Sequence, residues 1–554
     1  MIRIGNASGF YGDRLSAMRE MLTGGRLDYL TGDYLAELTM LILGRDRLKD
    51  PNRGYARTFL RQLQDTLDLA LENHVKIVTN AGGVNPAGLA AAIRELNPDV
   101  KVAHVEGDDL LQQGFDGALT ANAYLGCWGI VECLNAGADI VVTGRVTDAS
   151  LVVAPAAAHF GWGRDDLDAL AGATVAGHVI ECGTQATGGN FAFFTEIPDL
   201  GHPGFPIAEI DEHGQSVITK HAGTGGAVTV DTVKAQLLYE IASPRYLGPD
   251  VTARFDTITL TQEADDRVAI SGVKGEAPPD TLKVCVNTLD GFRNSMTFVL
   301  CGLDIDHKAA LARRQLESAI GSDGLEWTLA RTDHPDADTE ETASALLHAT
   351  IRTPDSQRAK AFSRAAVELA LASYPGFTLT SPPGDGTPVG VYHPKYVPQE
   401  AVHHEAVLPD GTRRTISPPD VTVLTRAPNP VADSQISDGP ADHGSTTRTP
   451  LGVIAGARSG DKGGDANLGV WVRDPAAYPW LAAELTVDRL RELLPEAKDL
   501  DIDRHPLPNI SAINFVLHGL LGQGVAASTR FDPQAKALGE WLRSRVVDVP
   551  VSLL

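Results

Sequence analysis

The sequence has 554 residues and a mass of 58.8 kDa, enough for about three or four domains of ~150 residues each. Hydrophobic residues make up 43% and charged residues 21%, a composition typical of a globular protein rather than a disordered or fibrous one. The 47 Lys and Arg residues against 71 Asp and Glu residues give a net charge of −24, which repels a phosphate backbone and argues against a nucleic-acid partner.

A short apolar run, a polar turn and a helix-length segment recur through residues 1–174. The apolar runs are 2–5, 75–79 and 139–143, and the helical segment 87–93 follows the second of them. Strands that alternate with helices predict a parallel sheet with helices on both faces. Sheets of this kind bind ligands at the carboxyl ends of their strands, where the polar turns lie. We therefore expect residues 1–174 to form a parallel α/β lobe.

The pattern changes at about residue 175, where Gly-rich turns begin to separate short β-branched runs. These runs are 228–230, 258–261 and 284–286. They predict a mixed, β-rich second lobe over residues 175–425, with more antiparallel pairing. A helix is expected at 309–319, followed by a strand and a helix that reach about Tyr374.

Residues 426–450 are rich in Pro, Gly, Ser, Asp and Thr, which predicts a linker after the region 1–425. The remainder, 451–554, has the size of a small domain. Strands are expected at 451–455, 469–472 and 511–517, and helices at 485–494 and 535–546. This mixture predicts a small α+β domain.

Candidate binding residues begin with the turn Asn80-Ala81-Gly82-Gly83, which follows an apolar run and precedes a helix. Glycines permit positive φ and a close approach of a ligand to the backbone, and the first turn of a helix offers N–H groups to an anion. Asn80, Gly82 and Gly83 are therefore candidate substrate-binding residues. A tight strand-to-helix turn capped by asparagine explains the same residues.

Arg145 and Asp148 lie in the turn Gly144–Asp148, directly after the apolar run 139–143. An arginine at a strand end can hold an anionic group, and an aspartate three residues later can orient it or act as a base. The alternative is an Arg–Asp pair that closes its own loop and caps the next helix. We favour the functional interpretation because other polar turns are expected at the same edge of the sheet.

Asp33 and Glu37 are four residues apart, so a helix would place both carboxylates on one face. Paired carboxylates can divide acid and base roles, or bind a divalent cation such as Mg²⁺. Surface carboxylates at the start of a helix account for the same spacing, and we favour that interpretation.

A dense polar and Gly-rich stretch, 181–190, follows His178. Glu181 or His178 can serve as a general base, while Gln185 and glycine N–H groups polarise a carbonyl. Cys182 also suggests a nucleophile, but a thiol without a neighbouring base is usually a packing residue.

A second Gly-rich turn, Lys220–Gly226, contains the candidate binding residues Lys220, Thr224 and Gly225. It is similar to an anion-binding turn whose charge comes from Lys220. A flexible hairpin loop is the alternative.

The C-terminal region contains the polar stretch 458–467, with four charged residues and three glycines between two expected strands. So polar a stretch predicts an exposed loop, and such loops commonly carry binding residues. Asp461 and Lys462 are therefore candidate substrate-binding residues. A solvated turn explains the composition equally well.

The five cysteines include no CxxC pair, which fits a reducing compartment. No apolar run approaches 18 residues, and Met1–Gly5 enters a strand-like run without the plan of a signal peptide. We expect a soluble, cytoplasmic protein with no membrane partner. Neither an HExxH motif nor a GxSxG motif is present, which disfavours zinc and serine-hydrolase chemistry.

Five separated motifs together resemble one known family. They are Ile4–Asp13, Asn80–Gly83, Gly137–Asp148, Gly223–Gly226 and Arg458–Gly463. The sequence is similar over nearly its whole length to the acyclic terpene utilisation protein A (AtuA) family. This resemblance implies an N-terminal domain of unknown function followed by a small ferredoxin-like domain.

The resemblance implies a role in degrading terpenoid, branched-chain or aromatic acids as coenzyme A thioesters. Hydration of an enoyl-CoA thioester needs an acid, a base and donors to the thioester oxygen, but no redox cofactor. We therefore expect a hydratase or lyase, with Glu181, Asp148 and His178 as catalytic candidates and coenzyme A as part of the substrate. A homo-oligomer is expected on general grounds.

Two other functions remain open. A phosphate-ester or polyphosphate hydrolase would use Mg²⁺ near Asp33 and Glu37. A non-catalytic binding or assembly protein would use the C-terminal domain to join subunits or to dock a partner enzyme.

Overall fold

The computed structural model describes residues 1–424 and 444–554, which form two compact units. The first unit comprises residues 1–287, 392–525 and 534–554, and the second comprises 288–391 and 526–533. None of the helices in the described residues has the length and apolar character needed to cross a membrane. Every candidate site residue named above lies in the first unit.

An 11-stranded sheet runs through the described part of the first unit, in the order β11-β12-β8-β7-β1-β2-β3-β6-β4-β19-β20. Its five central strands pair in parallel. They are β1 (Ile2–Asn6), β2 (Tyr29–Gly32), β3 (Lys76–Thr79), β6 (Ile140–Thr143) and β4 (Val102–Glu106). The predicted parallel α/β arrangement is confirmed, and β1, β3 and β6 correspond to the three apolar runs.

Helices cover both faces of the parallel strands, because successive side chains of a strand point to opposite sides. Leu30 and Ile77 pack with one set of helices, and Tyr29 and Val78 pack with the other. The first set is α1 (Ala17–Thr23), α3 (Arg57–Gln64), α4 (Leu67–Glu72) and α5 (Pro86–Leu96). The second is α6 (Trp128–Asn135), α7 (Ser150–Phe160) and α8 (Leu167–Ile180).

Antiparallel strands extend this sheet at both edges. They are β7 (Pro206–Ile210), β8 (Ser216–Lys220), β12 (Arg267–Ser271) and β11 (Thr259–Ala264) on one side, and β19 (Glu405–Val407) and β20 (Arg413–Thr415) on the other. Residues before and after 175 therefore share one sheet. The expected division at residue 175 lies within α8, a continuous buried helix of small apolar residues.

The β-branched run 228–230 is not a strand. Thr229 is the N-cap of α9 (Val230–Leu237), and its hydroxyl accepts a hydrogen bond from the Thr232 N–H. A threonine at this position favours a helix start, which outweighs the β propensity of its neighbours. A further small sheet joins β9 (Arg245–Leu247), β10 (Thr252–Arg254) and β13 (Lys274–Glu276).

The C-terminal part forms the predicted α+β domain. Its four-stranded antiparallel sheet contains β22 (Ala455–Lys462), β23 (Asp465–Val472), β25 (Ala512–Leu517) and β24 (Ile502–Leu507). Leu468 and Phe515 on one face share a core with α12 (Tyr478–Glu484), α13 (Val487–Leu493) and α14 (Leu538–Arg543). The expected exposed loop 458–467 is wrong: β22 and β23 occupy it, and the strand alternation is masked by small residues such as Gly460 and Ala466.

The predicted linker 426–450 is described only at its end. Residues 426–443 lie outside the described residues, whereas β21 (Thr446–Pro450) pairs with β26 (Val546–Pro550). The last five residues of the expected linker are thus part of a two-stranded sheet.

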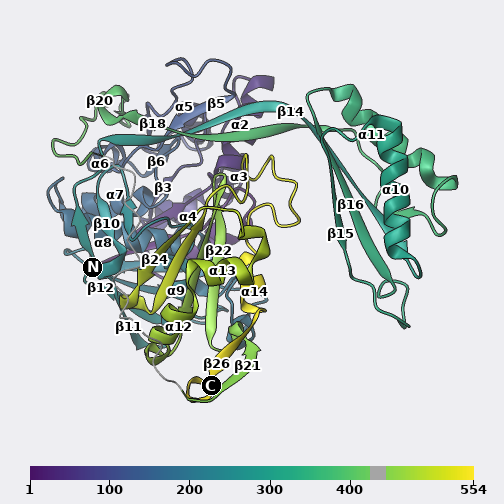
Figure 1. The fold of residues 1–554 in the computed structure, drawn as a ribbon. Helices are drawn as coiled ribbons and strands as arrows, with labels where there is room; N and C mark the ends of the chain where they lie inside the picture. Colours follow the sequence, from purple (N-terminus) through teal and green to yellow (C-terminus); the bar gives the residue numbers. More distant parts are fainter. Residues whose placement is uncertain (425–443) are drawn as a thin grey trace. The chain divides into compact units, whose positions relative to one another are not determined.

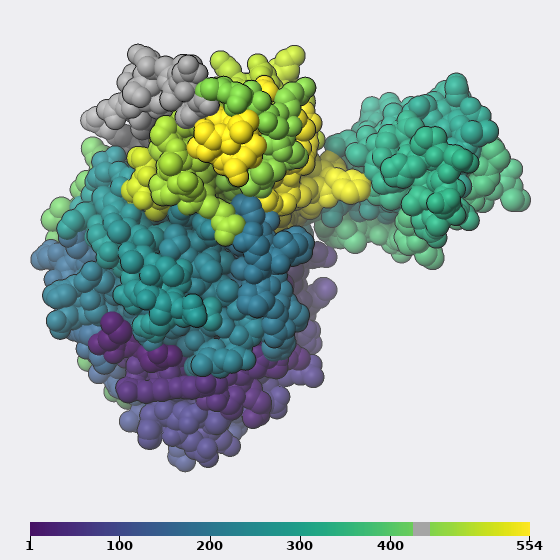
Figure 2. Space-filling model, turned by 90° about the horizontal axis from the view of Figure 1, so that it is seen from below, coloured from purple at the N-terminus to yellow at the C-terminus, as the bar shows by residue number. Residues whose placement is uncertain are grey.

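The face of the C-terminal sheet opposite its helices packs against the N-terminal part of the same unit. Trp471 is fully buried in the large N-terminal core and stacks on Phe191. Strand β22 lies beside α9 (Figure 1), and the yellow-green C-terminal residues cover teal residues of the N-terminal part (Figure 2). The C-terminal domain therefore has two buried faces.

The second unit is built around the second half of β14 (Thr281–Cys301), whose first residues pair with β5 (Thr120–Ala123) in the first unit. Its sheet includes β16 (Ser344–Thr353), β15 (Leu325–Ala330) and β17 (Thr378–Leu379). Helices α10 (Ile305–Ile320) and α11 (Ser356–Glu368) cover one face of this sheet (Figure 1). The helix expected at 309–319 is part of α10.

Candidate functional site

Each of the five parallel strands ends at or just before a buried polar residue. In strand order these residues are Asn6, Asp33, Asn80, Arg145 and Asp108. All five are 6% exposed or less. Because the strands are parallel, their carboxyl ends meet at one edge of the sheet, so these side chains lie along that edge. This is the edge at which the sequence predicts a site.

Arg145 forms the centre of the polar contacts at this edge. Its Nη1 donates to Asp148 Oδ1 at 2.8 Å and to the Leu35 carbonyl at 3.0 Å, and its guanidinium lies 4.3 Å from the centre of the Tyr124 ring. The Arg145 backbone N–H donates to Asp108 Oδ2 at 2.8 Å. The predicted pairing of Arg145 with Asp148 is therefore present, in a buried setting.

Asp33 and Asn80 bring two neighbouring strand ends together. Asn80 Nδ2 donates to Asp33 Oδ1 at 2.6 Å, and Asn80 Oδ1 accepts from the Tyr34 N–H at 2.8 Å. Burial raises the pKa of Asp33 well above its usual range, and the negative charge of Asp148 raises it further, against the opposing effect of Arg145. Asp33 therefore binds a proton more tightly than an exposed aspartate does.

Glu181 and His178 form a hydrogen-bonded pair at the end of α8. Glu181 Oε1 lies 3.0 Å from His178 Nδ1. Burial raises the pKa of Glu181 well above its usual range, with Asp148 and Glu240 adding to the effect, and burial lowers the pKa of His178 to about 4. The His178 imidazole is therefore neutral at neutral pH, and it contacts a carboxyl group that binds its proton more tightly than an exposed glutamate does.

His178 itself is enclosed, with a side chain only 2% exposed. Its ring packs 5.1 Å from the Tyr246 ring and 5.6 Å from the Phe255 ring, measured between centroids. Asn6 Nδ2 donates to the Ile180 carbonyl at 2.6 Å and to the Glu181 carbonyl at 2.9 Å, which fixes the end of α8 against β1. His178 thus contacts Glu181 from an enclosed position, and its predicted catalytic role stays a prediction.

Glu37 and Lys283 also belong to this edge, and sequence reasoning did not connect them. Glu37 is the first residue of α2 (Glu37–Lys49), and its Oε1 accepts from Tyr124 Oη at 2.9 Å and lies 3.5 Å from Lys283 Nζ. Burial acts to raise the pKa of Glu37, but Lys283 and Arg145 outweigh it and lower the value to about 2. Glu37 is therefore ionised at neutral pH.

The predicted placement of Asp33 and Glu37 on one face of a helix is wrong. Asp33 lies in the turn after β2, and α2 begins only at Glu37. Asp33 contacts Asn80, whereas Glu37 contacts Tyr124 and Lys283. No group of three or more His, Cys, Asp or Glu side chains in residues 1–424 and 444–554 is arranged to hold a metal ion.

The C-terminal domain contributes two of the predicted residues to this edge. Lys462 Nζ donates to the Glu240 carbonyl at 2.5 Å. Burial raises the pKa of Asp461 to about 7, and the charges of Glu240 and Glu37 act in the same direction. Burial lowers the pKa of Lys462, and the charge of Lys283 lowers it further. Both residues therefore share the electrostatic environment of the N-terminal strand ends.

We call these residues the carboxyl-edge cluster. Its members are Asp33, Glu37, Asn80, Arg145, Asp148, His178, Glu181, Glu240, Lys283, Asp461 and Lys462. Three buried atoms of the cluster, Arg145 Nε, His178 Nε2 and Glu181 Oε2, have no hydrogen-bond partner among the described residues. Buried polar atoms almost always have a partner, so these three atoms are free for water or a ligand.

The protein-family comparison agrees with this arrangement of domains. The model of the acyclic terpene utilisation family protein AtuA matches residues 2–408. The chain belongs to this family. The AtuA ferredoxin-like domain matches residues 449–548, so the four-stranded C-terminal sheet is part of a ferredoxin-like domain. Comparison with curated proteins gave no match.

The two AtuA matches together include every member of the carboxyl-edge cluster. The first match covers the members from Asp33 to Lys283, and the ferredoxin-like match covers Asp461 and Lys462. The cluster therefore joins both domains of the AtuA family within one chain.

The glycines of the turn Asn80–Gly83 shape the backbone of this AtuA-family chain. The Gly83 N–H donates to the Asn80 carbonyl at 3.1 Å, the Val84 N–H to the Gly54 carbonyl at 2.9 Å, and the Asn85 N–H to the Gly82 carbonyl at 2.8 Å. Asn85 then caps α5 by accepting from the Gly88 N–H at 3.0 Å. These contacts are those of a strand-to-helix turn, and they occupy the Gly83 N–H; the predicted binding role of Asn80, Gly82 and Gly83 stays a prediction.

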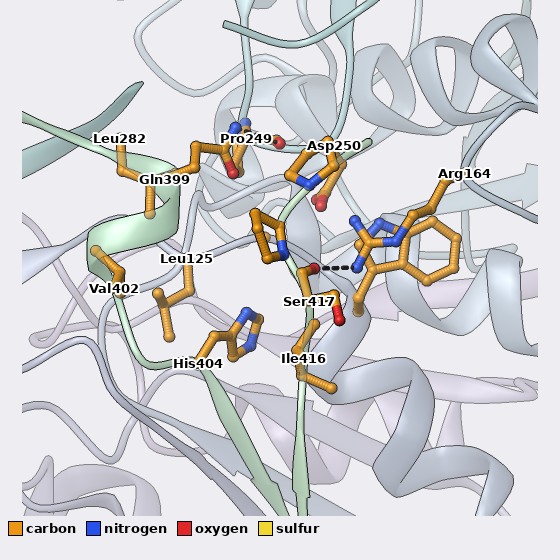
Figure 3. Close-up of a pocket in the computed structure, with 14 residues that line it drawn as sticks. Leu125, Arg164, Pro249, Asp250, Leu282, Gln399, Val402, His404, Ile416 and Ser417 are labelled. Atoms are coloured by element: carbon orange, nitrogen blue, oxygen red, sulfur yellow. Dashed lines mark hydrogen bonds between the residues drawn. The ribbon is translucent and has the colours of Figure 1, made fainter. Parts of the chain in front are cut away.

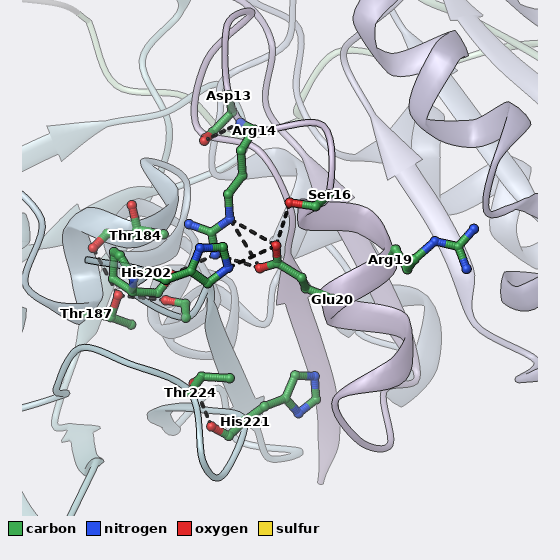
Figure 4. Close-up of polar contacts among 12 residues, drawn as sticks. Asp13, Arg14, Ser16, Arg19, Glu20, Thr184, Thr187, His202, His221 and Thr224 are labelled. Atoms are coloured by element: carbon green, nitrogen blue, oxygen red, sulfur yellow. Dashed lines mark hydrogen bonds and ion pairs between the residues drawn. The ribbon is translucent and has the colours of Figure 1, made fainter. Parts of the chain in front are cut away.

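The polar groups of the turn Lys220–Gly226 bind one another and neighbouring residues. Lys220 Nζ donates to the Thr224 carbonyl at 2.7 Å and lies 2.9 Å from Asp266 Oδ2. Thr224 Oγ1 donates to the His221 carbonyl at 2.7 Å (Figure 4). The Gly225 carbonyl accepts from the Gly204 N–H. The charge of Lys220 is thus neutralised locally, and these predicted residues stabilise their own turn.

Gln185 connects the stretch after Glu181 to the ferredoxin-like domain. Its side-chain oxygen accepts from Arg458 Nη2, and Arg458 lies 4.2 Å over the Tyr239 ring. Burial raises the pKa of the neighbouring Cys182 thiol well above its usual range, and the charges of Glu181 and Glu240 raise it further. Cys182 therefore stays protonated, as expected of a packing residue.

A separate cavity of about 30 Å³ lies beside the start of α6 (Figure 3). Arg164, Asp250 and His404 line it, and Arg164 Nη2 donates to the Ser417 carbonyl at 2.7 Å. Burial lowers the pKa of His404 to about 3. The volume suits about one water molecule, and no predicted site residue lines this cavity.

Proposed function

We propose that this AtuA-family chain is an enzyme of acyl-CoA catabolism that acts as a hydratase or lyase on an enoyl-CoA thioester. The observation that carries the proposal is Glu181, a buried carboxyl group whose pKa is raised well above its usual range and which has one oxygen without a protein partner. The charge of Arg145 acts on the same group and opposes this rise. A carboxyl group with a raised pKa suits general acid catalysis.

In this reaction Glu181 supplies the proton, and its hydrogen bond to His178 holds the carboxyl group in place. Asp148 is the corresponding base that activates water. Burial raises the pKa of Asp148 and the contact with Arg145 opposes that rise, so its pKa is drawn toward the working pH. Two carboxyl groups with different surroundings can thus divide the acid and base roles.

Arg145 supplies the third group that the reaction needs, a hydrogen-bond donor to the thioester oxygen. Its Nη1 is bound to Asp148 and to the Leu35 carbonyl, so the guanidinium has a fixed orientation. The free Nε–H donates to the thioester oxygen, where negative charge develops during attack on an enoyl thioester. A rigid donor of this kind costs no reorganisation at the moment of reaction.

The proposal is tested with purified protein and a panel of branched and terpenoid enoyl-CoA thioesters, by following loss of the conjugated-thioester absorbance. Glu181→Gln keeps the shape of the side chain but removes the transferable proton, so it should lower kcat/KM by about 100-fold or more. Glu209→Gln is the matched control, because Glu209 is a buried glutamate paired with Arg3 on strand β1 and with Arg267. It should retain the wild-type kcat/KM. Failure to bind or hydrate any thioester would overturn the proposal.

A further inference from the structure

Glu240 has an unusual backbone conformation for its residue type. Its φ is +56°, in the left-handed region that a glutamate rarely adopts. Such a conformation costs energy and persists only where the surroundings hold it. Glu240 lies in the segment between α9 and β9, and no sequence motif marks it.

The ferredoxin-like domain supplies the contacts that hold this segment. The Glu240 N–H donates to Asn467 Oδ1 at 2.7 Å, and the Glu240 carbonyl accepts from Lys462 Nζ at 2.5 Å. Both backbone groups of the left-handed residue are thus bound by side chains of adjacent C-terminal strands, β22 and β23.

Two buried asparagines also form hydrogen bonds with the backbone of the residues around Glu240. Asn467 Nδ2 donates to the Leu238 carbonyl at 2.8 Å and to Asn514 Oδ1 at 2.6 Å. Asn514 Nδ2 donates to the Ala242 carbonyl at 2.7 Å. Both asparagines are fully buried, where an unpaired amide costs about 1–3 kcal/mol, so these contacts fix the segment strongly.

Two glycines of the C-terminal sheet also leave room for the segment that contains Glu240. A Cβ at Gly460 would overlap the Tyr239 ring, and one at Gly469 would overlap the Leu238 side chain. The backbone of Leu238 and Tyr239 therefore approaches the C-terminal sheet more closely than other residues would permit.

The Glu240 carboxylate interacts with residues of both domains. Its charge acts on Glu181 and His178 from α8, and on Asp461 and Lys462 from β22. It also acts on the Cys182 thiol. Glu240 thus lies between the proposed acid and the hairpin of the ferredoxin-like domain.

We propose that Glu240 is a further positioning residue of the site, and that the ferredoxin-like domain of the same chain holds it there through Asn467 and Lys462. Its negative charge keeps the proton on Glu181, which is the state that an acid needs before the reaction. This role rests on the proposed function of Glu181. The ferredoxin-like domain is then part of the site in cis.

Cys182 reports on the charge of Glu240 without any substrate. Thiols react as thiolates, so the alkylation rate below the thiol pKa follows that pKa. The other charged groups that act on Cys182 are Glu181, Asp33 and Arg458, all of which stay in place when Glu240 is changed to Gln. Iodoacetamide labelling, followed by mass spectrometry of the Cys182 peptide, measures the rate at each pH.

Glu240→Gln should increase the Cys182 alkylation rate about threefold or more, which corresponds to a fall of about half a pKa unit. Glu209→Gln should leave that rate unchanged. In the thioester assay, loss of activity at high pH should begin at a lower pH in Glu240→Gln, because Glu181 releases its proton more readily. The groups facing Glu181 in this profile are His178, Asp148, Arg145, Lys462 and Glu240.

A double-mutant cycle tests the hold by the ferredoxin-like domain. If Asn467 holds Glu240 in place, Glu240→Gln should change the alkylation rate less in an Asn467→Ala background than in the wild type. Independent effects would overturn the proposed hold.

A melting comparison tests the left-handed backbone conformation of Glu240. Glu240→Gly should melt at or above the temperature of Glu240→Ala, because glycine adopts φ +56° without strain.

An unchanged Cys182 rate in Glu240→Gln would overturn the inference whatever the enzyme does to thioesters. A threefold rise with no activity on any thioester would support the placement of Glu240 and overturn the proposed function instead. The two failures are therefore distinguishable.

Discussion

Buried carboxylates lie at both ends of the central sheet, but their charges are balanced differently. Near the amino end of β1, Glu209 is paired with two arginines, Arg3 and Arg267. At the carboxyl end, the single guanidinium of Arg145 acts on Asp148, Glu37 and Asp33. One carboxylate with two cations is fully compensated, whereas three carboxyl groups around one arginine are not.

This difference separates a structural ion pair from a candidate site. A compensated pair can form without shifting the protonation of its members, whereas an excess of buried carboxyl groups forces protons onto some of them. That excess opposes folding, and clusters of this kind concentrate at functional sites. The carboxyl-edge cluster, in which the pKa of Asp33 is raised while Glu37 is ionised, has this character.

The largest expected effect is the difference between the stability lost in Arg145→Ala and that lost in Arg267→Ala. Arg145→Ala removes the buried cation that pairs with Asp148, while Lys283 still faces Glu37, so it should lower the free energy of unfolding by about 3 kcal/mol. Arg267→Ala should cost less than about 1 kcal/mol, because its side chain is 36% exposed and Glu209 keeps Arg3. Urea denaturation measures both values. Equal losses would contradict the proposed difference between the two ends.

The next effect is a dependence of the free energy of unfolding on pH, which comes from Asp108. Burial raises the pKa of Asp108 to about 7. The folded state then binds this proton more tightly than the unfolded state, so stability falls as the pH rises from about 4 to 7. The loss should be on the order of 4 kcal/mol for this group, from ~1.4 kcal/mol per unit. Asp108→Asn should flatten this part of the curve in urea denaturation at each pH. An unchanged slope would show that the charge is compensated.

The sequence predicts the edge of the site because strand ends are local features. Asn80 and Arg145 follow short apolar runs, and parallel strands must bring such positions together. Asp108 follows the same rule, since Gly107-Asp108 comes directly after β4, and Gly32-Asp33 likewise stands at the end of β2, with Gly32 its last residue. A Gly-Asp pair after an apolar run is the signal that would have identified it.

Other members of the cluster have no such local signal. Lys283 lies within the long strand β14, and Glu240 is placed by contacts with Asn467, more than two hundred residues later. The sequence also cannot show whether backbone donors are free. In the turn at Gly83 the N–H group is already bound to Asn80, which only the folded chain reveals.

The smallest expected effect tests which property makes an excess of carboxylates lower the stability: their burial, or the ratio of negative to positive groups. His518 lies 3.0 Å from both Asp465 and Asp503, again an excess of carboxylates, but its side chain is 41% exposed. Burial would lower the pKa of His518, yet the hydrogen bonds to Asp503 and Asp465 outweigh it and raise the value. The stability from this group is present below about pH 6.5 and is lost as the pH rises through the raised pKa. His518→Gln should remove that step, which solvent screening keeps under about 1 kcal/mol. Thermal unfolding between pH 6 and 8 measures this change in stability. A change as large as that expected for Asp108 would mean that solvent exposure does not reduce the cost of excess carboxylates. Burial would then not be what distinguishes the carboxyl-edge cluster.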